Sequence, residues 1–202
     1  MRRLTGSDLV VATHNAGKLE EIAALLAPYG MRCRGAAELG LPEPEETEDT
    51  FVGNARIKAR AAASATGLPA LADDSGIEVA ALGGAPGVRT ADWAQTPTGR
   101  DFMVAMTRTR HALLDTGAAQ PWRAQFCCTL VVAWPDGEEA VFDGIMPGEL
   151  VWPVRGTLGH GYDPMFQPDG HDKTFAELGF AEKNRFSHRA IAFRKLTAAC
   201  FT

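Results

Sequence analysis

The chain has 202 residues, of which 46% are hydrophobic and 22% charged, values that are ordinary for a soluble globular protein with room for a sizeable core. The formal net charge of −5 provides no broad positive surface for a nucleic-acid backbone. A mildly acidic protein of this kind could bind an anionic ligand only by concentrating positive charge locally or by using a metal ion.

The four cysteines favour a reducing compartment. None of them belongs to a Cys-x-x-Cys pair, so neither a zinc site nor a redox motif is indicated. No apolar stretch is long enough for a signal peptide or a membrane span. We therefore expect a cytoplasmic protein that binds neither membranes nor nucleic acid.

Strands and helices alternate along the first part of the sequence. Apolar spacing predicts, in chain order, a buried strand at 8–13, a helix at 19–26, a strand at 31–34, an acidic loop at 41–49 and a long helix at 50–66. Gly67 is typical of a helix stop. Residues 70–72 predict a further strand that ends at Asp73-Asp74-Ser75-Gly76, and residues 77–80 predict another.

The second half combines a hairpin with two helices. The expected elements are a helix at 98–114, hairpin strands at 123–134 and 139–145, a glycine-rich loop at 156–169 and a closing helix at 187–199. Strands that alternate with helices, followed by a long hairpin, indicate an α/β fold with a mixed sheet. We expect one domain that spans residues 1–202.

The segment Thr13-His14-Asn15-Ala16-Gly17-Lys18 lies where the first strand gives way to a helix. Such a junction offers backbone N–H groups and the positive end of a helix dipole, which suit phosphate, and Lys18 adds a charge. It differs from the common P-loop because the leading glycine is missing. The same segment also fits a polar turn in which Asn15 caps the helix.

The adjacent carboxylates of Asp73 and Asp74 follow an apolar strand. A buried pair of carboxylates requires a cation, and hard oxygen ligands suit Mg²⁺. Taken alone, however, the run is more typical of a turn, because Asp, Ser and Gly all favour turns. The acidic loop that contains Glu46 precedes Lys58, which could bind phosphate or be a plain surface lysine.

Two later segments carry further candidate residues. In Gly159-His160-Gly161-Tyr162-Asp163-Pro164, the Tyr162 ring could stack on a base and Asp163 could accept hydrogen bonds from it, although a plain β-turn fits as well. Near Lys183, Ser187 is a good helix cap, which places His188 and Arg189 in a first helical turn. Basic groups oppose the helix dipole there unless an anion is close.

Together these segments resemble the inosine triphosphate pyrophosphatase family, whose members remove noncanonical purine nucleotides. The resemblance extends from Val10 to about Phe193. Its motifs are Thr-x-Asn-x-x-Lys, Asn-Ala-x-x-Lys-Ala, Leu-Ala-Asp-Asp-Ser-Gly, Gly-Gly-Ala-Pro-Gly-Val, Gly-Tyr-Asp-Pro and Ser-His-Arg. The resemblance implies a two-lobed α/β body on a long mixed sheet with flanking helices, an active-site cleft between the lobes, and a homodimer.

The resemblance also implies a reaction: a nucleoside triphosphate and water give the monophosphate and pyrophosphate, with Mg²⁺ as cofactor. The preferred substrates would be ITP, dITP and XTP. Asp74 would be the proton acceptor and a metal ligand, with Glu46 and Asp73 also at the metal. The residues implied to contact the nucleotide are Thr13, His14, Asn15, Ala16, Gly17, Lys18, Lys58, Ser75, His160, Gly161, Tyr162, Asp163, Lys183, His188 and Arg189.

Two positions depart from the family pattern. His160 stands where a larger aromatic residue is common, and Arg89 stands where a tyrosine is common. The first bears on how a base is stacked and the second on the dimer. Two alternative functions are a related pyrophosphatase for modified pyrimidine triphosphates and a nucleotide-binding module without catalytic activity.

Overall fold

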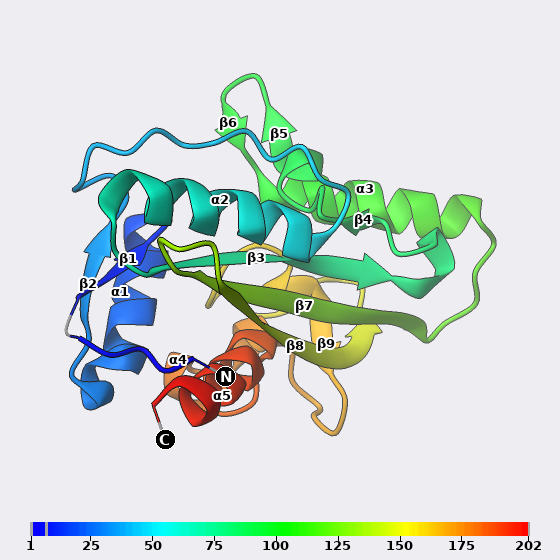
Figure 1. Ribbon diagram of the computed structural model, residues 1–202. Coiled ribbons are helices and arrows are strands. Elements are labelled where there is room, and N and C mark those ends of the chain that lie inside the picture. Colours follow the sequence, from blue (N-terminus) through cyan, green and yellow to red (C-terminus); the bar gives the residue numbers. More distant parts are fainter. Residues whose placement is uncertain (1, 7, 202) are drawn as a thin grey trace. The chain divides into compact units, whose positions relative to one another are not determined.

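The computed structural model describes residues 2–6 and 8–201, which form a mixed α/β fold (Figure 1). Within these residues the main sheet has seven strands in the order β2-β1-β3-β7-β8-β9, with β4 paired to β3. The strands are β1 (Asp8–Val11), β2 (Arg32–Gly35), β3 (Ala70–Val79), β4 (Pro86–Gly87), β7 (Trp122–Ala133), β8 (Glu139–Leu150) and β9 (Phe166–Pro168). Strand β1 pairs in parallel with β2 and β3, whereas β3–β4 and β8–β9 are antiparallel, so the predicted mixed sheet is confirmed.

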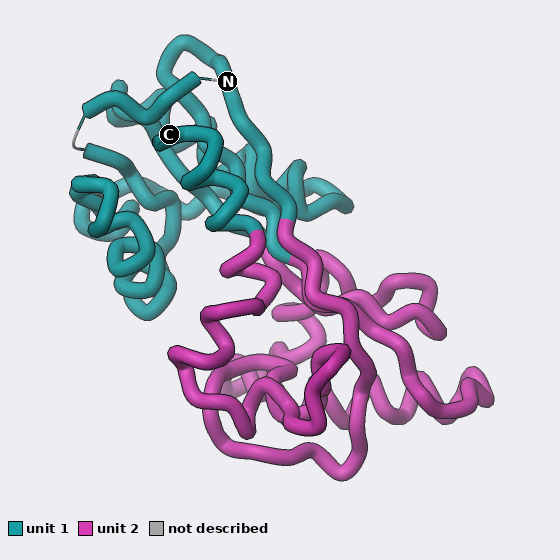
Figure 2. Tube along the Cα trace, turned by 90° about the horizontal axis from the view of Figure 1, so that it is seen from below, with its two compact units in different colours: residues 1–74, 128–143, 192–202 teal, residues 75–127, 144–191 magenta. Residues whose placement is uncertain are grey.

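The helices are α1 (Ala16–Leu26), α2 (Phe51–Thr66), α3 (Phe102–Asp115), α4 (Phe180–Lys183) and α5 (His188–Cys200). A small separate hairpin is made of β5 (Gln95–Thr96) and β6 (Gly99–Arg100). The chain divides into two compact units (Figure 2). Unit 1 comprises residues 1–74, 128–143 and 192–202, and unit 2 comprises residues 75–127 and 144–191.

Unit 1 packs helices on both faces of its part of the sheet. Successive strand side chains point to opposite faces, and β1 follows this rule. Leu9 and Val11 join the cluster that contains Ile22 of α1, whereas Val10 joins the alanines of α2. In β3, Leu71 lies on the α1 side and its neighbours Ala70 and Ala72 lie on the α2 side. The alternation therefore decides which helix each later residue of β3 faces.

The prediction that Asp73-Asp74-Ser75-Gly76 forms a turn is wrong. The two strands predicted around it are one strand, β3, which runs unbroken from Ala70 to Val79. Its first residues pair with β1 and its last with β4, and it lies beside β7 in the sheet. These long-range hydrogen bonds hold the segment extended against its local preference for a turn.

The expected start of α3 is also corrected. The helix begins at Phe102 rather than near residue 98, because Gly99 and Arg100 pair with β5 in the small hairpin. Asp101 caps the helix, and its carboxylate accepts a hydrogen bond from the Met103 N–H at 2.8 Å. Helix α1 begins at Ala16, earlier than the expected residue 19, and the short helix α4 was not expected. Helix α2 lies where it was expected, and Gly67 is its C-cap with a φ of 67°.

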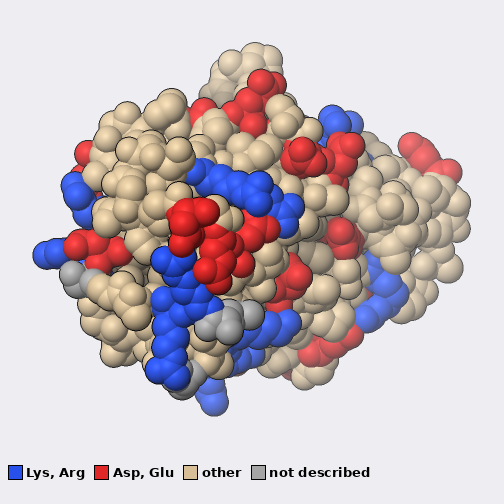
Figure 3. All heavy atoms as spheres, in the orientation of Figure 1, with Lys and Arg blue, Asp and Glu red and all other residues tan. Residues whose placement is uncertain are grey.

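The surface shows charges of both signs side by side. On the face seen in Figure 3, acidic and basic side chains lie next to one another in several places. The Arg2 guanidinium, for example, pairs with Asp136 and Glu138. Within the described residues, no helix is both long and apolar enough to cross a bilayer.

Candidate active site

The loop before α1 has the shape predicted for a helix start. The Asn15 side chain accepts a hydrogen bond from the Lys18 N–H at 3.1 Å, and the Thr13 hydroxyl accepts one from the Asn15 N–H at 3.2 Å. The His14 Nε2 lies 2.8 Å from the Leu41 carbonyl oxygen, where the acidic loop begins. The cap predicted at Asn15 is confirmed, and a helix N-terminus of this kind favours anions nearby.

Asp73 and Asp74 face different helices, as the alternation along β3 requires. The Lys18 Nζ of α1 donates to both Asp73 carboxylate oxygens, at 3.1 and 2.9 Å. The Lys58 Nζ of α2 lies 3.8 Å from the Asp74 Oδ1. Each carboxylate therefore has a lysine from the helix that covers its own face of the sheet.

The acidic loop is held against α2. The Lys58 Nζ donates to the Glu46 Oε1 at 2.7 Å, which brings Glu46 and Asp74 to the same ammonium group. The buried Asn54 side chain accepts a hydrogen bond from the Glu48 N–H at 3.0 Å. Asn54 and Lys58 therefore act from the same helix face, one on the loop backbone and the other on a loop side chain.

Gly53 allows this close approach of the loop. A Cβ atom at this position would lie 2.5 Å from the Glu48 Cβ and 2.9 Å from the Thr50 hydroxyl oxygen. We expect Gly53→Ala to lower the stability by about 1–3 kcal/mol, although alanine is the better helix former. Thermal unfolding measures the loss. Gly179→Ala is the control, since nothing lies within 4 Å of its Cβ, and a Gly53→Ala protein as stable as the wild type would contradict the packing described.

Burial raises the pKa of the Asp74 carboxyl to about 6. The nearby Lys58 ammonium opposes this shift, whereas the carboxylates of Glu46 and Asp73 add to it. For Lys58, burial alone would lower the pKa, but the negative charges of Asp74, Asp73 and Glu46 raise it above its ordinary value. Lys58 therefore stays charged, and Asp74 can gain or lose a proton near neutral pH, as a general base must.

The donor set around Lys58 suits a hard divalent cation. The carboxylate oxygens of Asp74 and Glu46, which share Lys58, and of Asp73, on the other face of β3, are the ligand type that Mg²⁺ prefers. Over residues 2–6 and 8–201, no group of three His, Cys, Asp or Glu side chains converges on a single point that could hold a metal. Because Mg²⁺ commonly takes only one or two protein carboxylates and fills its shell with water and phosphate oxygens, the residues present fit this ion.

In unit 2, the buried carboxylate of Asp163 joins two of the predicted site residues. Its Oδ2 accepts hydrogen bonds from the His160 N–H at 2.9 Å and from the Lys183 Nζ at 2.5 Å. A Cβ on Gly159 would lie 2.1 Å from the same oxygen, and the φ of Gly159 is +75°, so this position requires glycine. His160, Asp163 and Lys183 are thus brought together, and Asp163 holds the loop in shape.

Tyr162 does not have the position expected of a base-stacking residue. Only 1% of its surface is exposed, and its ring meets that of Phe102 edge-on at 6.3 Å between centroids. Its hydroxyl lies 2.9 Å from the Thr109 hydroxyl on α3, and burial raises its pKa to about 12. The hypothesis that this ring stacks on a base is therefore corrected: Tyr162 belongs to the core of unit 2.

This position leads to a prediction for Tyr162→Phe. The substitution keeps the ring and removes the hydrogen bond with Thr109, so we expect a loss of about 1 kcal/mol in the free energy of unfolding. Nucleotide affinity should stay unchanged. Tyr29→Phe serves as control, because Tyr29 is exposed and stacks on Phe201. A weaker affinity for nucleotide at unchanged stability would show that Tyr162 contacts the ligand.

The predicted basic residues His188 and Arg189 lie at the start of α5, where the His188 ring packs against an aromatic side chain. The Ser187 hydroxyl accepts a hydrogen bond from the Ala190 N–H at 3.3 Å, as expected for a cap. The His188 ring stacks on Phe126 with centroids 4.8 Å apart and planes 10° from parallel. Both His188 and Arg189 are buried. No pattern in the sequence singles out Phe126, which is one of several apolar residues in β7.

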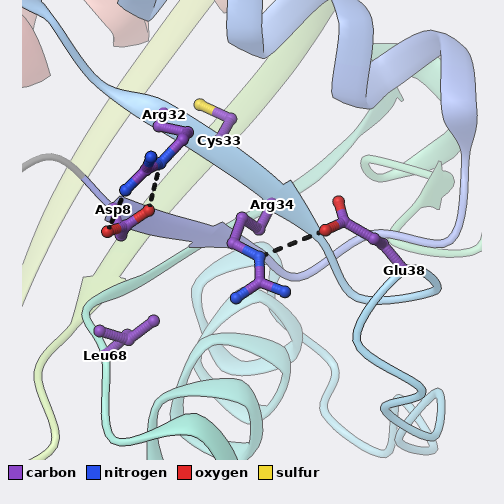
Figure 4. Close-up of a pocket in the computed structure, with 6 residues that line it drawn as sticks. All are labelled: Asp8, Arg32, Cys33, Arg34, Glu38 and Leu68. Atoms are coloured by element: carbon purple, nitrogen blue, oxygen red, sulfur yellow. Dashed lines mark hydrogen bonds and ion pairs between the residues drawn. The ribbon is translucent and has the colours of Figure 1, made fainter.

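A pocket of about 520 Å³ lies elsewhere in unit 1, at β1 and β2 (Figure 4). The Arg32 guanidinium donates to both carboxylate oxygens of Asp8, at 2.7 and 2.8 Å, and the Arg34 Nε lies 3.2 Å from the Glu38 Oε1. None of the site residues predicted from sequence lines this pocket. It is therefore separate from the group formed by Asp74, Lys58 and Glu46.

Comparison with known proteins finds similarity along nearly the whole chain. Residues 9–199 match the Ham1 family. A protein of Ruegeria pomeroyi named dITP/XTP pyrophosphatase is 64% identical over 200 residues, which cover 99% of this chain and 98% of the relative. A protein of Rhodospirillum centenum with the same name is 55% identical over 200 residues, with the same coverage of both chains.

Solved structures give the same result for the fold. The structure of a HAM1 protein from Coxiella burnetii superposes with a TM-score of 0.90 at 37% identity, covering 96% of this chain and 98% of that one. The Staphylococcus aureus Ham1 protein has a TM-score of 0.85 at 34% identity, covering 96% and 97%. With these similarities and the site geometry described above, the chain belongs to the Ham1 family.

Proposed function

We propose that this protein hydrolyses noncanonical purine nucleoside triphosphates, namely dITP, XTP and ITP, to the monophosphate and pyrophosphate, and so removes them from the nucleotide pool. Relatives that are 64% and 55% identical over nearly their full length are named dITP/XTP pyrophosphatases. The observation that carries the proposal is the buried Asp74 carboxylate, with a pKa of about 6, beside Lys58 and Glu46. This is the arrangement of a general base in an acidic, cation-binding group.

In this reaction Asp74 takes a proton from water as the water oxygen attacks the α-phosphorus, and the bond between the α- and β-phosphates breaks to release pyrophosphate. The backbone N–H groups of residues 13–18, with Ser75, bind phosphate oxygens. Lys18 and Lys58 neutralise their charge. Mg²⁺, held by Asp74 with Glu46 and Asp73, would neutralise the phosphates further and lower the pKa of bound water.

For the base, we propose contacts from His160, Gly161, Lys183, His188 and Arg189. A 6-oxo group accepts a hydrogen bond where adenine carries an amino group, so a donor such as Arg189 would favour inosine and xanthine over adenine. Buried groups left mispaired with the wrong base account for such selectivity. Asp163 supports this loop through its bonds with His160 and Lys183.

We further propose that the whole chain works as one pyrophosphatase domain, as a homodimer, in the cytoplasm. The match to relatives over 99% of the chain supports the single domain. All four cysteines, which lie within the described residues, are thiols rather than disulfides, and this supports a reducing compartment. Size-exclusion chromatography with light scattering tests the dimer.

Pyrophosphate release tests the reaction itself. We expect XTP, dITP and ITP to be hydrolysed with Mg²⁺ present, with pyrophosphate as the first product and little turnover when the metal is chelated. Side-by-side assays with dUTP and methylated dTTP test the pyrimidine alternative, which predicts faster turnover of those substrates. Orthophosphate as first product excludes cleavage between the α- and β-phosphates, and nucleotide binding without turnover favours a non-catalytic module.

A further inference from the structure

The carboxylates proposed to hold Mg²⁺ are already bound to lysines. The Lys18 Nζ contacts both Asp73 oxygens, at 3.1 and 2.9 Å. The Lys58 Nζ lies 2.7 Å from the Glu46 Oε1 and 3.8 Å from the Asp74 Oδ1. The two ammonium groups thus occupy positions beside all three carboxylates that a cation would otherwise use.

The ion pairs of Asp73 and Asp74 are largely shielded from water, whereas the Glu46 side chain is 39% exposed. The side chains are 3% exposed for Asp73, 11% for Asp74 and 12% for Lys58, whereas Lys18 is 29% exposed. Charges at such separations interact strongly when little solvent screens them. A divalent cation entering here would be repelled by both ammonium groups at short range.

The balance of charge favours movement of the two lysine ammonium groups from the carboxylates to phosphate oxygens when polyphosphate binds. Three carboxylates and two ammonium groups leave this group with one net negative charge. A divalent cation alone would reverse that sign among buried groups, which is unfavourable. A triphosphate instead brings several negative charges with strong acceptor oxygens, and so offers both lysines alternative partners. Lys18 already lies in the first turn of α1, where anions are favoured.

We propose that Lys18 and Lys58 keep divalent cations from the carboxylates of Asp73, Asp74 and Glu46 until polyphosphate draws the ammonium groups away. The proposal rests on the function proposed above, since it concerns the same residues. Both lysines then have two roles: they are internal counter-ions of the acidic group, and they bind the phosphates. Binding of metal and binding of nucleotide then favour each other. The nucleotide draws the ammonium groups away from the carboxylates, and the metal takes their place as the counter-ion of those carboxylates.

Binding of Mn²⁺ alone, with no nucleotide present, tests the proposal without relying on activity. The electron paramagnetic resonance signal of unbound Mn²⁺ is measured as protein is added at pH 7.5. We expect weak binding by the wild type and at least about tenfold tighter binding by both Lys58→Met and Lys18→Met, which remove one ammonium group each. Lys195→Met is the matched control, because the Lys195 Nζ donates to the Asp143 carbonyl oxygen and Lys195 is not among the groups that shift the pKa of Asp74 or Lys58.

A double variant assigns the binding to this group of residues. Lys58→Met combined with Asp74→Asn should bind Mn²⁺ as weakly as the wild type. Tight binding that persists in the double variant, or wild-type binding as tight as that of both single variants, overturns the proposal. Thermal unfolding verifies that each variant folds, and the more exposed Lys18 provides a second test if Lys58→Met is unstable.

The two proposals fail in different ways. If the wild type releases pyrophosphate from XTP but neither lysine variant binds Mn²⁺ more tightly, only the inference about the lysines is wrong. If no nucleotide is hydrolysed, the proposed function is wrong, and the Mn²⁺ measurements still decide whether the lysines exclude cations.

Discussion

Asp74→Asn should reduce pyrophosphate release from XTP by roughly 10²–10⁴-fold, the range typical of a lost general base. The amide has nearly the size of the carboxylate but cannot accept the proton from water. The measurement is kcat at saturating substrate and pH 7.5. Asp143→Asn is the control, since Asp143 is exposed and accepts a hydrogen bond from the Thr129 hydroxyl at 2.7 Å. If Asp74→Asn keeps activity close to that of the wild type, Asp74 is not the general base.

The same substitution should stabilise the protein at neutral pH. The pKa of Asp74 is raised from 3.8 to about 6 in the folded state, so the folded protein prefers the neutral form. The stabilising effect of this preference is complete below pH 4 and is lost as the pH rises through 6. Asparagine is neutral throughout, so the variant gains up to about 3 kcal/mol above pH 6 and nothing below pH 4. Unfolding in urea at pH 4 and pH 8 measures the difference.

Lys58→Met should lower kcat/KM for XTP by roughly 10²-fold at neutral pH and also move its pH dependence. In the wild type, kcat/KM should fall about tenfold per pH unit below the Asp74 pKa of about 6, because only the ionised carboxylate accepts a proton. The Lys58 ammonium opposes the upward shift of that pKa. Without the ammonium group, the pKa of Asp74 should rise further, so the fall of kcat/KM on the acidic side of the pH profile should move to higher pH.

The pH profile distinguishes this electrostatic role from a purely structural one. Loss of packing around a methionine would lower activity evenly across the pH range, whereas loss of the charge moves the midpoint. Lys195→Met should leave both the rate and the midpoint unchanged. An unshifted acidic limb in Lys58→Met would show that Lys58 does not act on Asp74.

Local signals in the sequence were sufficient for both ends of α2 and for the cap of α1. Thr50 and Gly67 cap the two ends of α2, and Asn15 caps the start of α1. These residues form hydrogen bonds with backbone groups that have no partner within the helix, through their own side chains or backbone. The hairpin of β7 and β8 was likewise predictable, since turn residues separate two apolar runs. Family motifs then connected the segments and implied which residues do the chemistry.

Long-range pairing decided what the sequence could not. The run Asp73-Asp74-Ser75-Gly76 favours a turn locally, but its neighbours in the sheet hold it inside β3. Tyr162 looked available for stacking because nothing in its local sequence reveals that Thr109, on a distant helix, bonds its hydroxyl. Burial and hydrogen bonds between distant residues leave no local pattern.

The sequence by itself determined the family, and through its motifs it assigned a pair of carboxylates, two lysines and a capped helix start to one polyphosphate-binding site. The tertiary structure decided how the charges are arranged. Because side chains alternate along β3, Asp73 pairs with Lys18 of α1, whereas Asp74 faces Lys58 of α2 and shares it with Glu46. Burial on the α2 side then gives Asp74 a pKa of about 6, a property of the packed protein that its sequence neighbours do not specify.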